Sequence, residues 1–245
     1  MDKTLTLWDI DGNLVNVYKY HTPTYQKAME AVYGVRPSLE EIEENYGLPA
    51  SEVVAEPIRK FGIDESVIQE GIGDVLSRYS EQLEEGIKAS SEKIVLPGVS
   101  ELLRKINSLG IPMGIVTGNI RKAGEAIING SNLDGFFDPR INSYGDHASY
   151  RHEIVRDAIN RTRRFSLIEE SAQVYVFGDT PADVEAAKEN DCISIAVIKN
   201  SNELDSSPGG ESYSKRKEAL KKSDPDFLFD DYTNLGEILV AMGIK

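Results

Sequence analysis

The chain has 245 residues, of which 40% are hydrophobic and 28% are charged, an ordinary composition for a globular protein with a buried core. Its 27 basic and 41 acidic residues give a net charge of -14, which argues against nucleic acid and anionic membranes as partners. The same charge repels an anionic substrate. Binding one would therefore require local positive potential, supplied by a bound cation or by helix N-termini.

Cysteine content and hydropathy argue against a disulfide-bonded, membrane-spanning or secreted protein. The single cysteine, Cys192, excludes an internal disulfide, and its apolar surroundings predict a small buried side chain. No apolar run approaches the roughly 20 residues of a membrane span. The first residues, Met1–Thr4, lack the charged and apolar regions of a signal peptide. We therefore expect a cytoplasmic protein, and the sequence leaves monomer and homodimer open.

The first part of the chain combines one strand with a long helical segment. A short apolar strand is predicted at Leu5–Trp8, and it ends abruptly at Asp9-Ile10-Asp11-Gly12-Asn13. From about Val15 to Lys93, apolar residues recur at three- and four-residue spacings, which is typical of amphipathic helices. The helices expected there are Thr24–Tyr33, Leu39–Tyr46, Ser51–Phe61 and Asp64–Glu85.

After Pro97-Gly98 the pattern changes to an alternation of helices and strands. The expected helices are Val99–Leu109, Arg121–Asn129, Arg151–Arg164, Ala182–Asn190 and one near Leu235–Met242. The expected strands are Ile111–Val116, Arg140–Ser143, Val174–Phe177, Ile193–Ile198 and Phe227–Phe229. The polar stretch Asn200–Ser223 is interpreted as a surface loop with one helical turn around Lys215–Lys221.

Strands separated by helices predict an α/β fold, a Rossmann-like parallel sheet with helices on both faces. The first strand must join this sheet, because alone it could not bury its apolar side chains. The helical segment is therefore an insertion. We expect residues 1–14 and 94–245 to form the α/β core domain and residues 15–93 to form an inserted, all-helical cap domain.

Four strands of this sheet lead into polar residues suited to one site. Open parallel sheets bind ligands at the carboxyl ends of their strands. The polar residues that follow strands or open the next helix are Asp9, Asp11, Thr117-Gly118-Asn119, Arg151 and Gly178-Asp179-Thr180-Pro181-Ala182-Asp183. These residues are expected to face one crevice.

Simpler explanations account for some of these residues. Asp11-Gly12 suits a tight turn, and Thr180, Pro181 and Asp183 suit the start of a helix. Neither explains Asp9 or Asp179, since each places a carboxylate where an apolar strand ends. Two acidic strand ends would repel each other unless a cation joined them. Carboxylate oxygens are the protein ligands that Mg²⁺ prefers, so Mg²⁺ is the expected cofactor.

Together the three motifs resemble the haloacid dehalogenase superfamily of phosphatases, and the helical insertion resembles its C1-type cap. The resemblance implies that Asp9 attacks phosphorus and that Asp11 acts as acid and then base. It implies that Asp9, the Asp11 carbonyl and Asp179 bind Mg²⁺, with Asp183 supporting them. It also implies that Thr117, Gly118 and Asn119 hold the phosphoryl oxygens.

Two departures from the family pattern are visible. Asn13 stands where the family more often has threonine. The basic phosphate clamp is usually a lysine, and Arg151 is its expected replacement, with Lys122 as the second candidate. In the cap, Tyr20, His21 and the Tyr46–Pro49 loop are candidates for substrate contacts.

Several activities fit this pattern. The leading interpretation is a phosphatase acting on a small phosphorylated metabolite, such as phosphoglycolate or a sugar phosphate. A phosphomutase would keep both aspartates, a dehalogenase would lack Asp11, and a phosphonatase would need a cap lysine such as Lys19 or Lys27. A receiver-like phospho-acceptor without turnover is the alternative from another class, but its acceptor would follow a middle strand.

Overall fold

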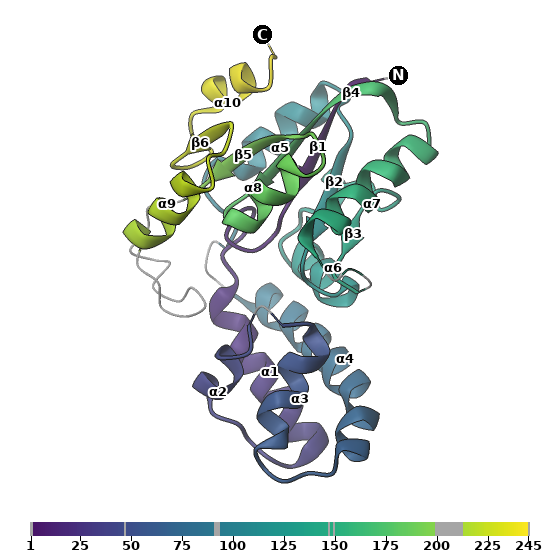
Figure 1. The fold of residues 1–245 in the computed structure, drawn as a ribbon, viewed down its shortest axis with the longest axis vertical. Helices are drawn as coiled ribbons and strands as arrows, with labels where there is room; N and C mark the ends of the chain where they lie inside the picture. The colour runs from purple at the N-terminus through teal and green to yellow at the C-terminus, as the bar shows by residue number, and fades with distance from the viewer. Residues whose placement is uncertain are drawn as a thin grey trace.

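The chain folds into an α/β lobe and a helical lobe, joined where the helical segment leaves and re-enters the sheet (Figure 1). The computed structural model describes residues 2–46, 48–90, 94–146, 148, 150–198 and 213–244. Both ends of the described chain lie in the α/β lobe, on the side away from the helical lobe (Figure 1). Within the described residues, no helix combines the length and apolar character needed to cross a bilayer.

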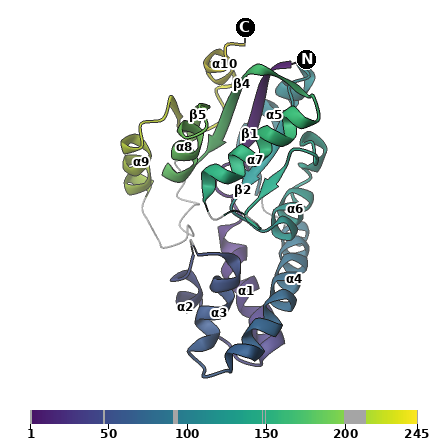
Figure 2. The ribbon, with the colours of Figure 1, turned by 45° about the vertical axis from the view of Figure 1, so that its right-hand side comes forward.

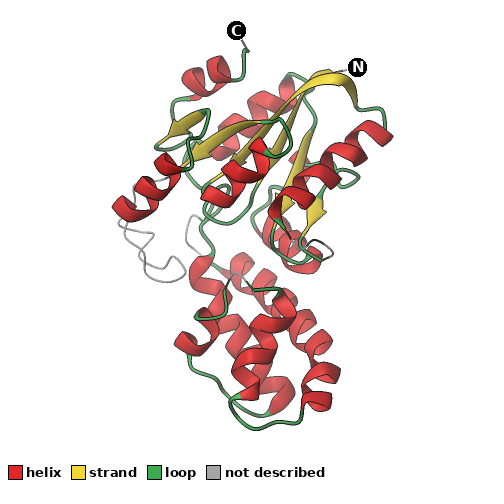
Figure 3. Cartoon of the chain, viewed as in Figure 1, coloured by secondary structure: helices red, strands yellow, loops and turns green. Residues whose placement is uncertain are grey.

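The α/β lobe is built on one parallel sheet, in which the described strands are ordered β3-β2-β1-β4-β5-β6 (Figure 3). The strands are β1 (Asp2–Trp8), β2 (Met113–Thr117), β3 (Ser143–Tyr144), β4 (Ile168–Gly178), β5 (Ile193–Val197) and β6 (Phe227–Phe229). The first strand lies between β2 and β4, so its carboxyl end is adjacent to theirs. The predicted Rossmann-like fold class is confirmed.

The two faces of the sheet bury alternate residues of each strand, as a period of two requires. On β1, Leu5 and Leu7 pack with the residues beneath α7 (Arg151–Arg164) and α8 (Pro181–Lys188). Trp8 instead belongs to the cluster beneath α5 (Val99–Ser108), α6 (Arg121–Gly130) and α10 (Leu235–Ala241), where it stacks on Phe177. The sheet is therefore covered by helices on both faces.

The inserted segment forms a helical lobe that packs against α6. Its helices are α1 (Tyr18–Tyr33), α2 (Leu39–Glu43), α3 (Ala50–Arg59) and α4 (Glu65–Ala89). The Tyr33 hydroxyl at the end of α1 donates to the Ile68 carbonyl of α4 at 2.6 Å. Farther along α4, Ile87 lies so close to Gly130 of α6 that a Cβ on the glycine would meet it at 2.7 Å. The long helix α4 therefore joins the two lobes (Figure 2).

Several elements differ from their predicted bounds. The strand predicted at Arg140–Ser143 is wrong at its start, because the Asp138 carboxylate accepts from the Arg140 amide at 2.9 Å and closes a turn. The predicted helical turn at Lys215–Lys221 is a complete helix, α9 (Tyr213–Lys222), anchored by the buried Leu220. A short 3₁₀ helix, η1 (Asp134–Phe136), was not expected. Residues 200–212 of the predicted loop lie outside the described residues.

Candidate active site

The first motif turns sharply away from β1 at a glycine. The Asp9 amide extends the strand by donating to the Phe177 carbonyl at 2.9 Å, and Gly12 then adopts a left-handed conformation with φ of 76°. A Cβ on Gly12 would lie 2.3 Å from Asp179 Oδ2 and 2.5 Å from the Tyr18 hydroxyl. Both the conformation and the space therefore require glycine at this position.

Asn13 fixes the same turn from inside the protein. Its side-chain amide donates to the carbonyls of Asp9 at 2.9 Å and Phe177 at 3.3 Å, which are the ends of β1 and β4. Its side-chain oxygen accepts from the buried Tyr232 hydroxyl. The departure from threonine thus places two amide protons on backbone carbonyls, which a threonine hydroxyl could not both satisfy.

Three buried carboxylates meet at the ends of β1 and β4. Asp9, Asp179 and Asp183 each offer an oxygen within 4.8 Å of the others. The pKa of Asp9 is raised to about 7, chiefly by burial; the charge of Arg151 opposes the shift, and the charges of Asp183 and Asp11 contribute to it. Burial likewise raises the pKa of Asp179 well above its usual range. Such carboxylates are costly to ionise together unless a positive charge lies among them.

A divalent cation fits this cluster. Asp179 Oδ1 is buried and has no hydrogen-bond partner, whereas native proteins pair almost all such atoms. When all four acids of the site (Asp9, Asp11, Asp179 and Asp183) are ionised, the guanidinium groups of Arg151 and Arg216 balance only half of their charge. The oxygen donors and the remaining charge both suit Mg²⁺, with Asp9 and Asp179 as its carboxylate ligands.

Arg151 bridges two of the three carboxylates. At the first turn of α7, it pairs with Asp9 Oδ1, and its Nε donates to Asp183 Oδ1 at 2.9 Å. Asp183 packs directly over Gly178, where a Cβ would lie 2.4 Å from the aspartate side chain. Lys122, the other candidate clamp, lies elsewhere and donates to Ser77 of α4 at 3.2 Å.

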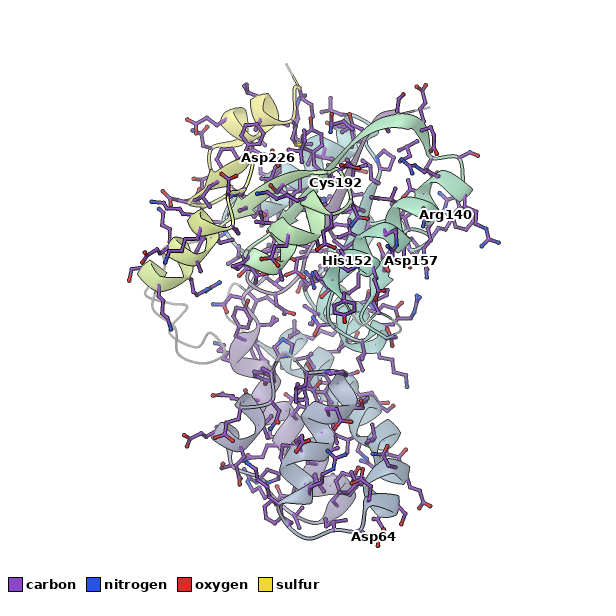
Figure 4. The ribbon with its side chains drawn as sticks, in the orientation of Figure 1. Asp64, Arg140, His152, Asp157, Cys192 and Asp226 are labelled. Atoms are coloured by element: carbon purple, nitrogen blue, oxygen red, sulfur yellow. The ribbon has the colours of Figure 1, made fainter. Side chains whose placement is uncertain are left out.

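Asp183 also caps α8. Its carboxylate accepts from the Thr180 amide at 3.1 Å and from the Thr180 hydroxyl at 2.7 Å. Asp183 therefore both caps α8 and contributes a carboxylate to the cluster with Asp9 and Asp179. Next to Arg151, His152 (Figure 4) has a partner outside the carboxylate cluster, since its Nδ1 lies 2.8 Å from Glu189 Oε2.

The loop after β2 faces the same carboxylates. Thr117, Gly118 and Asn119 line a cavity of about 260 Å³ together with Asp9, Asp11 and Arg151. The Thr117 hydroxyl accepts from the Asn119 amide at 3.3 Å, and the Asn119 side chain donates to Asp11. That this loop, including the Asn119 backbone amide, holds phosphate stays a prediction, while the Asn119 side chain orients the second aspartate.

The helical lobe, which is the predicted cap, contacts the site through His21. Its Nε2 lies 3.1 Å from Asp11 Oδ1, and its Nδ1 contacts the Tyr79 hydroxyl of α4. A chamber of about 210 Å³ opens beside Asp11. Its lining residues include Tyr18, Tyr25, Tyr46, Tyr79, Leu48 and Val53. Tyr20, the other predicted cap residue, is not among the described residues that line this chamber, and its hydroxyl donates to Ser90 at 2.7 Å.

Two residues of the site were missed by the sequence analysis. Tyr18 donates to the Asp11 carbonyl at 3.1 Å and contacts Asp179 Oδ2 at 3.4 Å. Arg216, on α9, donates to the same Asp179 oxygen at 2.6 Å. Arg216 stands between Lys215 and Lys217 in a polar stretch, and no local pattern distinguishes it from them. Only the folded chain brings it to the carboxylates.

Comparison with known proteins identifies the class of this site. The sequence profile of the haloacid dehalogenase-like hydrolase family matches residues 6–197, which contain all three motifs. The chain belongs to this family and is an enzyme of the hydrolase class. A Clostridium perfringens protein provisionally named pyrophosphatase PpaX is 24% identical over 224 residues, which cover 91% of each protein.

Solved structures share the fold over nearly the whole chain. A protein of Haemophilus somnus described as a predicted phosphoglycolate phosphatase superposes with a TM-score of 0.68 at 19% identity, covering 97% of both chains. The β-phosphoglucomutase of Clostridium difficile superposes with a TM-score of 0.67 at 16% identity, covering 99% of this chain and 98% of that one. At such identities the likeness establishes a common fold, and the chemistry must be argued from the site.

Proposed function

We propose that the protein is a Mg²⁺-dependent phosphatase that hydrolyses a small phosphomonoester through an aspartyl-phosphate on Asp9. The observation that carries the proposal is the convergence of Asp9, Asp179 and Asp183 within 4.8 Å, with Arg151 contacting Asp9 and Asp183. A phosphatase of this kind needs a nucleophile, cationic groups for the phosphoryl oxygens and an acid beside the leaving group.

Each catalytic role is assigned to a side chain of the site. Arg151 holds Asp9 through Oδ1, and attack by an Asp9 carboxylate oxygen on phosphorus splits hydrolysis into two easier displacements. Asp11 donates its proton to the leaving oxygen and then takes a proton from the water that cleaves the aspartyl-phosphate. Bound at Asp9, Asp179 and the Asp11 carbonyl, Mg²⁺ would neutralise the phosphoryl charge.

The chamber beside Asp11 supports a neutral, hydroxylated leaving group. It is lined by four tyrosines and several apolar side chains, and Asp11 is the charged residue among the described lining residues. Burial keeps the pKa values of Tyr25 and Tyr46 above their usual range, so both hydroxyls stay protonated. Of the two substrates suggested by the sequence, this lining favours a sugar phosphate over phosphoglycolate, whose carboxylate would approach Asp11.

One assay tests the catalytic proposal. Wild-type protein should hydrolyse p-nitrophenyl phosphate with Mg²⁺ and lose this activity in EDTA. Asp9→Asn should abolish turnover while the far-ultraviolet circular dichroism stays unchanged. Hydrolysis that survives either EDTA or Asp9→Asn would contradict the proposal.

A substrate panel tests the leaving group. Hexose monophosphates should be turned over with higher kcat/KM than phosphoglycolate or pyrophosphate. Leu48 is 47% exposed at the chamber, so Leu48→Arg should shift the ratio toward the anionic substrates without loss of stability. A wild-type preference for pyrophosphate or phosphoglycolate would contradict the assignment of the leaving group alone.

A phosphomutase is the second candidate, since it would use the same two aspartates and would have to exclude water, and His21 of the cap lies 3.1 Å from the Asp11 carboxylate. The same panel separates the two activities. A phosphatase releases inorganic phosphate in proportion to the substrate consumed, whereas a mutase converts one hexose phosphate into its isomer with little release.

A further inference from the structure

An arginine from α9 enters the acidic centre. The Arg216 Nη2 donates to Asp179 Oδ2 at 2.6 Å, with side-chain exposures of 15% and 0%. The helix α9 lies beside α8 in the α/β lobe, at the edge of the sheet that carries β5 and β6 (Figure 2). The catalytic roles proposed above make no use of this residue.

The two oxygens of Asp179 have different surroundings. Oδ2 accepts from Arg216 and from the Tyr18 hydroxyl, at 2.6 Å and 3.4 Å. Oδ1 is equally buried and has no hydrogen-bond partner. A buried carboxylate oxygen left without a partner is costly, and a bound cation would remove that cost.

We propose that Arg216 is a positioning residue for the cation site: it holds Asp179 by Oδ2 and so presents Oδ1 to the divalent ion. The inference rests on the proposed function, because it assumes that Asp179 binds the ion. The terminal torsion of an aspartate is soft, and a charge-assisted hydrogen bond on one oxygen fixes the direction of the other. Residues that orient metal ligands in this way typically alter affinity by about 10- to 100-fold.

A counter-ion role for Arg216 would change cation affinity in the opposite direction. If Arg216 were only a counter-ion that occupies the place of the cation, removing it would strengthen cation binding. The geometry favours positioning, because Arg216 and Tyr18 both contact Oδ2 and leave Oδ1 without a partner.

Direct titration of Mg²⁺ into the substrate-free protein by calorimetry tests the proposal. Arg216→Gln should weaken Mg²⁺ binding by about 10- to 100-fold, and Arg216→Lys should recover part of the loss. Lys217→Gln, on the same helix but paired with the exposed Asp230, is the matched control and should bind as wild type does. Thermal denaturation without Mg²⁺ checks that each variant folds.

Kinetics supply a second readout. In Arg216→Gln, raising Mg²⁺ should restore kcat, with the KM for substrate unchanged, whereas Asp179→Asn should not be rescued. Unchanged or tighter Mg²⁺ binding in Arg216→Gln would overturn the positioning role and leave the proposed phosphatase intact. Wild-type protein that binds no divalent ion would overturn both.

Discussion

Asp11 takes its orientation from two elements that meet only in the folded protein. Its carboxylate contacts His21 of the cap and Asn119 of the loop after β2, and Tyr18 donates to its carbonyl. The carbonyl that we assign to Mg²⁺ therefore belongs to the backbone, while the acid–base role belongs to the side chain. A substitution of the side chain separates the two.

The first prediction uses this separation. Asp11→Asn should lower kcat by about 10²- to 10⁴-fold, the usual contribution of a general acid or base, and leave Mg²⁺ affinity nearly unchanged. Steady-state kinetics and calorimetry on one preparation provide both numbers. Asp64→Asn serves as the control, because Asp64 caps α4 at the far end of the helical lobe (Figure 4) and asparagine caps equally well. Equal loss of kcat in both variants would contradict the assignment.

Two glycines with the same backbone conformation provide the second prediction. Gly12 and Gly34 have φ values of 76° and 71°, but a Cβ would collide with Asp179 at Gly12 and meet nothing within 4 Å at Gly34. Gly34→Ala should cost about 1–2 kcal/mol, the left-handed strain alone. Gly12→Ala should cost more and also weaken Mg²⁺ binding. Urea denaturation and calorimetry measure the two effects; equal effects would show that the close approach at Gly12 has no consequence.

At the level of elements, strand ends were more predictable than the contacts made there. Asp9, Thr117 and Asp179 were recognisable because each follows an apolar strand, and parallel strands end at one edge of a sheet. The side chains that contact those residues could not be recognised from the sequence. Arg216 and Tyr18 carry no spacing signal, and Tyr20 and His21 are neighbours on α1 whose side chains point in different directions.

The bounds of short elements also could not be predicted from the sequence. β3 begins only at Ser143, because Asp138 and Arg140 close a turn through side-chain hydrogen bonds that compete with strand pairing. Local hydropathy cannot reveal such a competition. The division into residues 1–14 and 94–245 against 15–93 stays a prediction, since the hydrophobic cluster that includes Val17 and Ile87 is continuous with the one beneath the sheet.

The third prediction concerns the contact between the lobes. Ile87 of α4 is 3% exposed and packs on Gly130 of α6. Ile87→Ala should reduce the free energy of unfolding by about 2–5 kcal/mol, through lost burial and a cavity. Val67→Ala, on the same helix but 50% exposed, should change it little. Denaturant titration compares the two, and equal costs would mean that α4 and α6 do not support each other.

On the scale of the whole molecule, the acidic cluster links stability to pH and to the cation. Burial raises the pKa of Asp9 from 3.8 to about 7, so without cation the folded protein binds more protons than the unfolded chain between these values. Stability must then fall as pH rises through this window.

The fourth prediction follows from that sign. In EDTA, the free energy of unfolding should fall between pH 5 and pH 7. The expected fall is about 1 kcal/mol for each pH unit over which the folded protein keeps a proton that the unfolded chain has lost. Asp9→Asn should flatten the decline, and saturating Mg²⁺ should oppose it, because the ion stabilises the ionised carboxylates. Urea denaturation at both pH values measures this. A wild-type slope that matches the slope of Asp9→Asn would contradict the raised pKa.

The central claim is that Asp9 carries the phosphoryl group. Asp11→Asn retains the nucleophile but lacks the base for the second displacement, so the covalent intermediate should accumulate. After a brief reaction with p-nitrophenyl phosphate and Mg²⁺ and an acid quench, peptide mass spectrometry should find one phosphoryl group on the peptide that contains Asp9. The label should be absent with EDTA and absent when Asp9→Asn is added to the variant. A label on any other residue, or none in a variant that still releases p-nitrophenol, would contradict the account.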